Sequence, residues 1–430
     1  SSGLAIPGKL NIAGAGTDIY VYLSRDEQIA DSSVVSLSNT ANFVRLNLNG
    51  YTETVGGINC ADGRGVVQSG NLVVGGSGSY SYNGYFRDFS GVNATLEKKG
   101  TGTQTLSGAN ITYTGGTTIN GGKLVLRDTT NSSFRAAAVT NNATLEFDAA
   151  TTNIDFTGTI SGTGAVQKTG SNRLTLGSAS NSYSGTTTIV DGVLSASSTA
   201  LPGAIVIQSG GAFAPGDGVG SATTGAATWS GGRYLFDIAD ADGIAGIDWD
   251  LWNIAGSMWI SGSSTLAVTT LNGEVAGEMA DFDNTTPYSW LLAETTGNTY
   301  GFFNLGLDAS GFQNELDPAG YLHLSAVGNF KQLYLNYSLS MPGDANRDNR
   351  VNEVDAKLLA TNWGQSGGWL DGDFNGDGIV NALDASILAA NWGYQGESSE
   401  SHQSVPEPGV LALLALGLLS LSAKRRARWR

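Results

Sequence analysis

The sequence is poor in cysteine, histidine and basic residues, and each scarcity excludes a class of protein. Its single cysteine, Cys60, rules out a disulfide within the chain, and we expect a small buried apolar side chain there. The two histidines are His323 and His402, so a Ser/His/Asp catalytic site is not expected. Lys and Arg number 22 against 38 Asp and Glu, which opposes binding to nucleic acid and favours divalent cations.

The chain also lacks the composition of a helical bundle. Charged residues make up 14% of it, whereas glycine occurs 61 times, which favours a β protein rich in turns. The basic residues are unevenly placed, since five of the 22 lie in the last seven positions. Without those five the formal charge falls from −16 to −21, so the body of the chain is strongly acidic.

The main organising feature is a segment that occurs twice, at residues 96–126 and 166–196, 70 residues apart. The copies align without a gap, so that Gly100 matches Gly170 and Tyr113 matches Tyr183. Short alternating apolar and polar runs separated by Gly, Asn and Ser predict strands and tight corners. A fixed internal period of this kind predicts the stacked coils of a solenoid, in which neighbouring coils cover each other's apolar faces.

These repeats resemble the autotransporter-associated β-strand repeat, and the pieces beginning at Phe89, Phe156 and Leu201 are similar to the same family. The resemblance implies a mainly β fold, a right-handed parallel β-solenoid (β-helix) that is exported and usually non-enzymatic. We expect this solenoid over residues 1–228, with repeats near 89–126 and 156–196. An aromatic-rich β segment, residues 229–340, either closes the solenoid or forms a β-sandwich cap.

The aromatic-rich segment leaves two functional interpretations open. Its tryptophans could form a platform for sugar rings, although alternate strand positions more often face the core. The tryptophans are Trp249, Trp252, Trp259 and Trp290. The nearby aspartates could in principle supply a glycosidase pair, but turn formation or calcium ligation is the simpler interpretation. The aspartates are Asp237, Asp240, Asp242, Asp248 and Asp250.

After residue 340 the pattern changes to a loop followed by a helix, and this unit occurs twice with an offset of 29 residues. Each loop has Asp or Asn at positions 1, 3, 5, 9 and 12, the ligand positions of an EF-hand-type calcium loop, with a backbone carbonyl at position 7. The ligands predicted in the first loop are Asp344, Asn346, Asp348, Arg350, Asn352 and Asp355. Those predicted in the second are Asp373, Asn375, Asp377, Ile379, Asn381 and Asp384.

Calcium is the predicted ion because a hard cation of this size takes six to eight oxygen ligands, and a tightly curled loop supplies them from one short segment. Two ions are expected, one in each loop. Gly378 at position 6 permits the sharp turn, and Asn349 at the equivalent position must adopt a left-handed conformation. The helices that follow have apolar faces formed by Val354, Leu358 and Leu359 and by Leu383, Ile387 and Leu388.

This duplication, residues 341–395, resembles a type I dockerin, which implies docking to a cohesin-like partner. In well-known dockerins Ser or Thr at loop positions 10 and 11 commonly contacts the partner and determines which partner is bound. Here those positions are Glu353-Val354 and Ala382-Leu383, so a familiar cohesin specificity is not carried over.

The end of the chain has three parts. A polar linker, residues 396–404, precedes Val405-Pro406-Glu407-Pro408, and an apolar run at 409–423 precedes a basic end. Residues 405–430 resemble a PEP-CTERM sorting signal. The resemblance implies export, transient retention in the membrane by a hydrophobic helix at 409–423, and cleavage near the Pro-Glu-Pro by an exosortase-type transpeptidase.

The sequence thus predicts an exported, non-catalytic structural or adhesion protein of the cell surface, cell envelope or extracellular matrix, with a calcium-binding docking module. Its expected partners are a cohesin-like protein, the exosortase and a surface polysaccharide, and nucleic acid is not among them. The alternative is a dockerin-bearing protein that binds or degrades polysaccharide, as a glycoside hydrolase or lyase on a β-helix.

Overall fold

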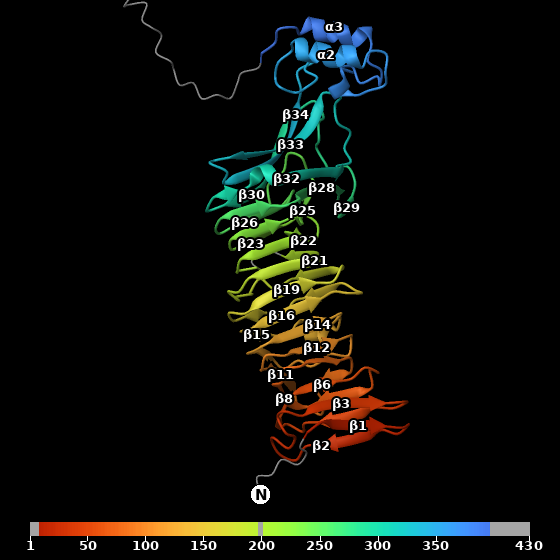
Figure 1. Ribbon diagram of the computed structural model, residues 1–430, viewed down its shortest axis with the longest axis vertical. Helices are drawn as coiled ribbons and strands as arrows, with labels where there is room; N and C mark the ends of the chain where they lie inside the picture. Colours follow the sequence, from red (N-terminus) through yellow and green to blue (C-terminus); the bar gives the residue numbers. More distant parts are fainter. Residues whose placement is uncertain (1–7, 197–200, 396–430) are drawn as a thin grey trace, which may run out of the picture. The chain divides into compact units, whose positions relative to one another are not determined.

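The computed structural model describes residues 8–196 and 201–395 of the 430-residue chain. The chain divides into two compact units between Leu339 and Ser340. The first is a β-solenoid of about 10 turns, and the second contains two short α-helices (Figure 1). The prediction of a mainly β solenoid followed by a small helical module is confirmed. The hydrophobic helix predicted at 409–423 lies outside the described residues.

The N-terminal coils of the solenoid form three sheets in which every strand pairing is parallel. The first runs β1 (Leu10–Gly14), β3 (Val34–Asn39), β6 (Gly57–Asn59). The second runs β10 (Tyr85–Arg87), β7 (Gly65–Gln68), β4 (Val44–Asn47), β2 (Ile19–Tyr22). The third runs β18 (Ile160–Ser161), β15 (Val139–Asn141), β13 (Thr117–Ile119), β11 (Ala94–Lys98), β8 (Gly70–Val74), β5 (Thr52–Val55).

A 16-stranded sheet runs through both repeats and on into the aromatic-rich segment. Its main path is β29 (Val275–Ala276), β28 (Ser264–Asn272), β25 (Arg233–Ile238), β22 (Ile205–Ala214), β21 (Thr187–Ala196), β19 (Ala165–Thr169), β16 (Thr144–Asp148), β14 (Lys123–Arg127), β12 (Thr103–Ser107), β9 (Ser79–Tyr82). Its side branches are β17 (Ile154–Phe156), β20 (Arg173–Leu176), β24 (Ala227–Ser230), β27 (Met258–Ser261), β31 (Thr299–Tyr300), β32 (Leu305–Gly311). Two short helices interrupt the coils, α1 (Ser132–Arg135) and η1 (Phe302–Asn304).

The last sheet of the first unit changes from parallel to antiparallel pairing. It runs β23 (Ser221–Thr224), β26 (Leu251–Ile254), β30 (Tyr288–Thr295), β34 (Gln332–Leu339), β33 (Gly320–Val327). Strands β23, β26 and β30 pair in parallel, whereas β34 pairs antiparallel with both β30 and β33. Coiling therefore continues well beyond residue 229, and the antiparallel strands cover an edge that would otherwise be open to further pairing.

Ladders of equivalent apolar residues form the core of the solenoid. Leu72 pairs with Leu96 across β8 and β11, and Val139 pairs with Ile160 across β15 and β18. All four side chains are buried. Burying a side chain of this size contributes roughly 1.5–3 kcal/mol, and one coil alone could not bury it. Figure 1 shows the strands of successive coils lying one above the other in this unit.

One lysine of each repeat lies inside this stack. Lys98 and Lys168 occupy the same repeat position and are buried. The Lys168 ammonium donates to the carbonyls of Thr169 at 2.8 Å, Gly170 at 2.6 Å and Asp191 at 2.9 Å. Lys98 makes the equivalent set of contacts in its own coil. Each lysine thus connects the corner of its own coil to the next coil through hydrogen bonds.

Candidate functional site

The second unit is built from two matching halves, each a loop that leads into a helix. The helices are α2 (Glu353–Thr361) and α3 (Ala382–Ala390), and η2 (Trp369–Asp371) lies between the halves. Asn352 caps α2 by accepting a hydrogen bond from the Val354 amide at 2.8 Å, while Asp355 accepts one from the Asn352 amide at 2.9 Å. Asn381 and Asp384 cap α3 in the same way. Loop positions 9 and 12 therefore also determine where each helix begins.

The first carboxylate of each loop holds the loop in a tight curl. Asp344 accepts hydrogen bonds from the amides of Asp348 at 3.1 Å and Asn349 at 2.8 Å. Asp373 accepts them from Gly376 at 2.9 Å and Gly378 at 2.8 Å. Position 6 has a positive φ in both loops, 67° at Asn349 and 85° at Gly378. The left-handed conformation predicted for Asn349 is thus confirmed.

Hydrogen bonds also draw the remaining predicted ligands together. In the first loop, the Asn346 amide donates to Asp355 at 3.2 Å, and its side chain donates to Asp348 at 2.9 Å. In the second, the Asn375 side chain donates to Asp377 at 3.0 Å. The position-7 residues also lie within the curl, since the amides of Arg350 and Ile379 donate to the position-5 carboxylates at 3.0 Å.

The end carboxylates of both loops are buried, whereas the middle ones are exposed. The buried ones are Asp344, Asp355, Asp373 and Asp384. Burial raises the pKa of Asp344, and the neighbouring charges of Asp355 and Asp348 add to the effect. The side-chain hydrogen bond from Asn375 lowers the pKa of the exposed Asp377. Buried carboxylates that repel one another carry an electrostatic cost, which a bound divalent cation would remove.

The donor chemistry fits a hard cation. No group of three or more His, Cys, Asp or Glu side chains that could hold a metal ion occurs in residues 8–196 and 201–395. The predicted sets instead combine aspartates with neutral donors, namely asparagine amides and a position-7 carbonyl. Oxygen-only sets of this kind suit calcium. Bound there, calcium would supply the positive charge that offsets the carboxylates, and the chain's own residues would hold the loops curled around it.

Backbone bonds connect each loop with the segment that follows the opposite helix. The Gly393 amide, after α3, donates to Val351 of the first loop at 2.9 Å. The Gly364 amide, after α2, donates to Val380 of the second loop at 2.8 Å. Val351 and Val380 are buried. Ordering one loop therefore constrains the end of the other half, which couples the two predicted sites.

The apolar faces predicted for the two helices are only partly buried. Leu359 and Leu388 are buried, but Val354 is 46% exposed and Leu383 is 59% exposed. Trp363 and Trp392, which follow the helices at equivalent positions, are also half exposed. These tryptophans are not among the residues predicted to lie on the surface, although their shared 29-residue offset is a usable signal. Each half of the unit thus presents two apolar side chains to solvent, Val354 and Trp363 in the first half and Leu383 and Trp392 in the second.

The structure sorts the tryptophans of the first unit into core and surface. Trp249, Trp252 and Trp290 are buried. Trp259 is 46% exposed and stacks on Tyr300 of the next coil, with ring centroids 5.6 Å apart. The four do not form one platform, because three of them lie in the core.

Three of the aspartates near these tryptophans, Asp240, Asp248 and Asp250, accept hydrogen bonds from backbone amides. Asp250 is buried and accepts hydrogen bonds from the amides of Gly220 at 2.7 Å and Asp237 at 3.0 Å. Burial raises its pKa well above the usual range, and the charge of Asp237 raises it further. Asp248 accepts a hydrogen bond from the Ile244 amide at 2.7 Å within a turn. Turn formation is therefore the role that these contacts support for Asp248.

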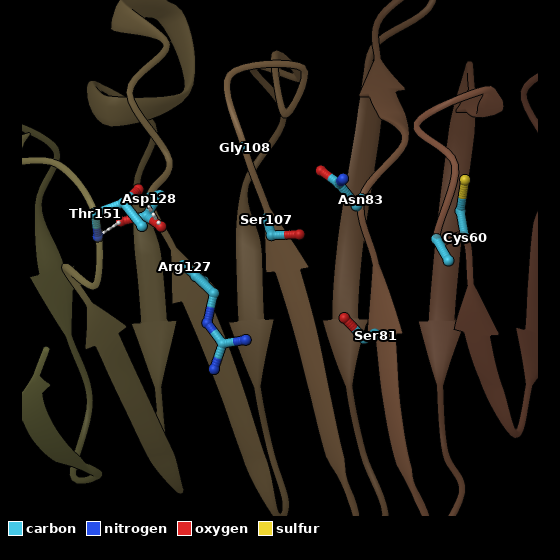
Figure 2. A pocket seen from close by; sticks show the side chains of 9 residues that line it. Cys60, Ser81, Asn83, Ser107, Gly108, Arg127, Asp128 and Thr151 are labelled. Carbon is cyan, nitrogen blue, oxygen red and sulfur yellow. Dashed lines mark hydrogen bonds between the residues drawn. The ribbon is translucent and has the colours of Figure 1, made fainter.

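A polar cavity of about 480 Å³ lies along successive coils of the solenoid (Figure 2). Its lining side chains include Ser81, Ser107, Arg127 and Asp128. Cys60 also borders it, but this cysteine is free and buried as predicted. Because burial raises the pKa of the Cys60 thiol, the sulfur stays protonated at neutral pH, and the thiol form is a poor nucleophile.

The fold and the paired loops define a composite protein, a parallel β-solenoid with a duplicated EF-hand-type module. Comparison with family models identifies the parts. Residues 96–126 and 166–196 match the passenger-associated-transport-repeat, residues 342–391 match the dockerin type I domain, and residues 404–426 match the PEP-CTERM protein-sorting motif. No curated protein matches the chain. The resemblances inferred from the sequence are confirmed for all three parts.

These matches give the coarse function. A type I dockerin domain generally binds calcium and implies a cohesin partner, and a PEP-CTERM motif implies an exosortase system and export to the cell envelope or surface. The sorting residues Val405, Pro406, Glu407 and Pro408 lie outside the described residues. Within the described part of the chain, no helix combines the length and apolar character that crossing a membrane requires.

Proposed function

We propose that this protein is an exported, non-catalytic component of the cell surface or matrix, in which the solenoid is a spacer and the second unit is a calcium-dependent docking module. Two calcium ions, one in each loop, would fix the loops and present the helix pair to a cohesin-like partner. The observation that carries the proposal is the duplicated loop geometry, with its buried end carboxylates and matching helix caps. Metal binding and folding are coupled in small modules of this kind.

Calorimetric titration of calcium into the full chain tests this proposal. Asp348→Ala and Asp377→Ala each remove an exposed position-5 carboxylate, so each should weaken binding in its own loop by on the order of tenfold or more. Glu353→Gln is the matched control, because Glu353 is exposed, follows the ligand Asn352 and is not itself a predicted ligand. It should titrate like the wild type.

Limited proteolysis gives an independent readout of the same proposal. Calcium should protect residues 342–394 from cleavage, and a chelator should remove that protection. Unchanged cleavage together with no heat of binding would refute the calcium-dependent module.

In this proposal the exposed apolar side chains that follow the two loops form the docking surface. Val354 and Leu383 lie at the loop positions that read the partner in related modules, and both are exposed. An apolar partner surface suits them better than one that presents hydrogen-bonding groups to Ser or Thr. Replacing both with Ser should weaken capture of a cohesin-like partner but leave calcium binding unchanged.

We propose further that the tail holds the protein briefly in the membrane through residues 409–423 before an exosortase-type transpeptidase cleaves near Pro406-Glu407-Pro408. Mass spectrometry of the mature C-terminus tests this step. A mature chain that still carries residues 409–430 would contradict it.

Polysaccharide binding is a second candidate function, favoured by the exposed aromatic side chains of the solenoid. Turnover by the same protein would extend it to an enzyme. Incubating the full chain with neutral and acidic glycans and measuring new reducing ends or unsaturated products tests for turnover. The non-catalytic proposal predicts none.

A further inference from the structure

The outer face of the sheet β10-β7-β4-β2 carries arginines among aromatic rings. We name the side chains of this sheet and its margins the arginine–tyrosine face. They are Tyr20, Tyr22, Phe43, Arg45, Val66, Gln68, Tyr85, Arg87 and Phe89. The two arginines place positive charge locally on a chain whose formal charge is −16.

Strand register brings these side chains together on one side. Tyr20 pairs with Arg45, Arg45 with Val66, and Val66 with Tyr85, so the four form one row across the sheet. Successive strands lie about 4.8 Å apart, so the row extends over about 14 Å. The residue that follows Arg45 on its strand, Leu46, points inward and is buried, as strand alternation requires.

The rings and guanidinium groups are stacked on one another. Arg45 lies over Tyr20 at 4.8 Å and over Phe43 at 5.1 Å, and Arg87 lies over Phe89 at 5.6 Å. Tyr20 and Tyr22 are nearly parallel, with an interplanar angle of 6°. They are 52% and 59% exposed, so flat aromatic surface faces solvent.

A cavity of about 190 Å³ opens in this face. Buried Val66 is among the residues that line it, and Phe43, Arg45, Tyr85 and Arg87 complete the lining. The cavity thus combines apolar surface, aromatic rings and two guanidinium groups, which is the mixture expected of a small-ligand site.

The two arginines differ in how their charge is balanced. Arg45 forms a salt bridge with Asp18 at 2.7 Å. Arg87 donates instead to the side-chain oxygen of Gln68, a neutral acceptor, at 3.1 and 3.0 Å. No carboxylate in residues 8–196 and 201–395 forms a salt bridge with Arg87. The neighbouring Asp88 accepts hydrogen bonds from Ala94 and Thr114.

Arg87 is therefore a positioned cation without a carboxylate partner in the described part of the chain. The Gln68 oxygen accepts from its Nε and from one terminal nitrogen, which leaves the other terminal nitrogen for a ligand as far as the described residues go. A fixed guanidinium of this kind suits a carboxylate. The parallel tyrosines lie on β2, at the opposite edge of the same sheet, and their exposed rings suit the apolar faces of sugar rings.

We propose that the arginine–tyrosine face binds an acidic polysaccharide, with the carboxylate of one uronic acid unit at Arg87 and neighbouring sugar rings on Tyr85, Tyr20 and Tyr22. The proposal gives the second candidate function a site and a ligand class. It uses no residue of the calcium loops, so the docking role and this binding can fail separately.

Affinity electrophoresis of the full chain through gels that contain polygalacturonate tests the proposal, with chelator present so that calcium cannot bridge polymer and protein. The wild type should be retarded, and added salt should reduce the retardation. Arg87→Gln should weaken binding roughly 10- to 100-fold, because it removes a charge-assisted hydrogen bond. Tyr22→Ala should weaken it less, since it removes one of the stacking surfaces.

Arg233→Gln is the matched control. Arg233 is exposed on the same solenoid and pairs with Asp308 at 2.9 Å, away from the arginine–tyrosine face. This variant should bind like the wild type, and thermal melts of all variants should agree. Soluble polyglutamate and neutral dextran serve as competitors.

Four outcomes would overturn the proposal. Absence of retardation by the acidic polymer would remove the site, as would an Arg87→Gln variant that binds like the wild type. If polyglutamate competed as well as polygalacturonate, the face would bind acidic chains in general rather than sugars. Equal competition by dextran would mean that the charge plays no part.

Discussion

The buried lysines of the repeats show how one residue can stabilise a coil corner. Lys98 and Lys168 each donate to corner carbonyls of two successive coils and so connect these coils inside the stack. Burial lowers the pKa of Lys168 to about 8, and the nearby charges of Asp191 and Asp148 act in the opposite direction. The ammonium is thus retained at neutral pH by its acceptors, at some electrostatic cost.

That lowered pKa predicts a pH dependence. Between pH 8 and about 10.4 the unfolded chain keeps the Lys168 proton that the folded chain has released, so the unfolding free energy should rise with pH. The slope contributed by one group is at most about 1.4 kcal/mol per pH unit. Below pH 8 both states are protonated and the contribution is flat. Denaturant unfolding from pH 7 to 10 measures it.

Comparison with variants isolates the contribution of Lys168 from those of other groups. Lys168→Met should lose the rise, so the difference between its stability and that of the wild type should change with pH. Lys99→Met is the control, since Lys99 is largely exposed and should leave the rise intact. A pH-independent difference between wild type and Lys168→Met would contradict the assignment.

A buried hydroxyl pair repeats with the lysines. Tyr183 and Thr187 share a hydrogen bond of 2.7 Å, and Tyr113 and Thr117 share one of 2.6 Å. Burial raises the pKa of Tyr183 to about 12. Tyr183→Phe leaves the Thr187 hydroxyl without this partner and should lower the unfolding free energy by about 1 kcal/mol.

Chemical denaturation measures that loss, and Tyr300→Phe, at a half-exposed ring, should change stability much less. In the double variant Tyr183→Phe/Thr187→Val the loss should be smaller than the sum of the single losses. Additive losses would show that the two hydroxyls act independently.

At the scale of the element, the coil corners require glycine because the backbones of successive coils touch there. Gly192 has a φ of 69°, and a β-carbon at this position would lie 2.3 Å from the Gly170 carbonyl oxygen. The same carbon would lie 2.8 Å from the Lys168 ammonium. Backbone strain and steric clash therefore act together at this corner.

Gly192→Ala should accordingly destabilise the solenoid by about 2–4 kcal/mol, since the strained φ alone costs about 1–3 kcal/mol. Gly218→Ala separates the two effects, because Gly218 has a φ of 85° but no atom within 4 Å of an added β-carbon. Gly218→Ala should lower the unfolding free energy by no more than the cost of the strained φ. Equal losses in thermal unfolding would mean that corner packing contributes nothing.

At the scale of the whole molecule, the two units are stabilised by different means. The solenoid depends on ladders of buried side chains contributed by neighbouring coils. The second unit has few buried apolar residues of its own, and its buried aspartates favour a bound cation. The stability of the two units should therefore respond differently to calcium.

Calorimetry of the full chain should show this difference as two transitions. Chelation should lower the midpoint of one transition, assigned to the second unit, and leave the solenoid transition within about 1 °C, because mass action acts only on the state that binds the ion. A calcium titration of the midpoint checks the assignment. A shift of both transitions, or of neither, would contradict it.

Much of this architecture could be predicted because it repeats. Period-two alternation between glycine-rich corners indicated the solenoid, and the shared 29-residue offset indicated the duplicated loops, down to the left-handed Asn349. Exposure could not be predicted in the same way. Trp252 and Trp259 look alike in the sequence, yet Trp252 is buried and Trp259 is exposed, because a corner separates their strands, β26 and β27, which belong to different sheets.

The sequence by itself determined the local chemistry, since the curl of each loop, the start of each helix and the positions of the oxygen donors depend on residues close together in the chain. Only the tertiary structure decided what lies side by side across coils. Arg45 and Arg87 are far apart in the sequence, and parallel stacking brings them into one cavity. Such a neighbourhood depends on strand register, which is a property of the assembled solenoid rather than of any one segment.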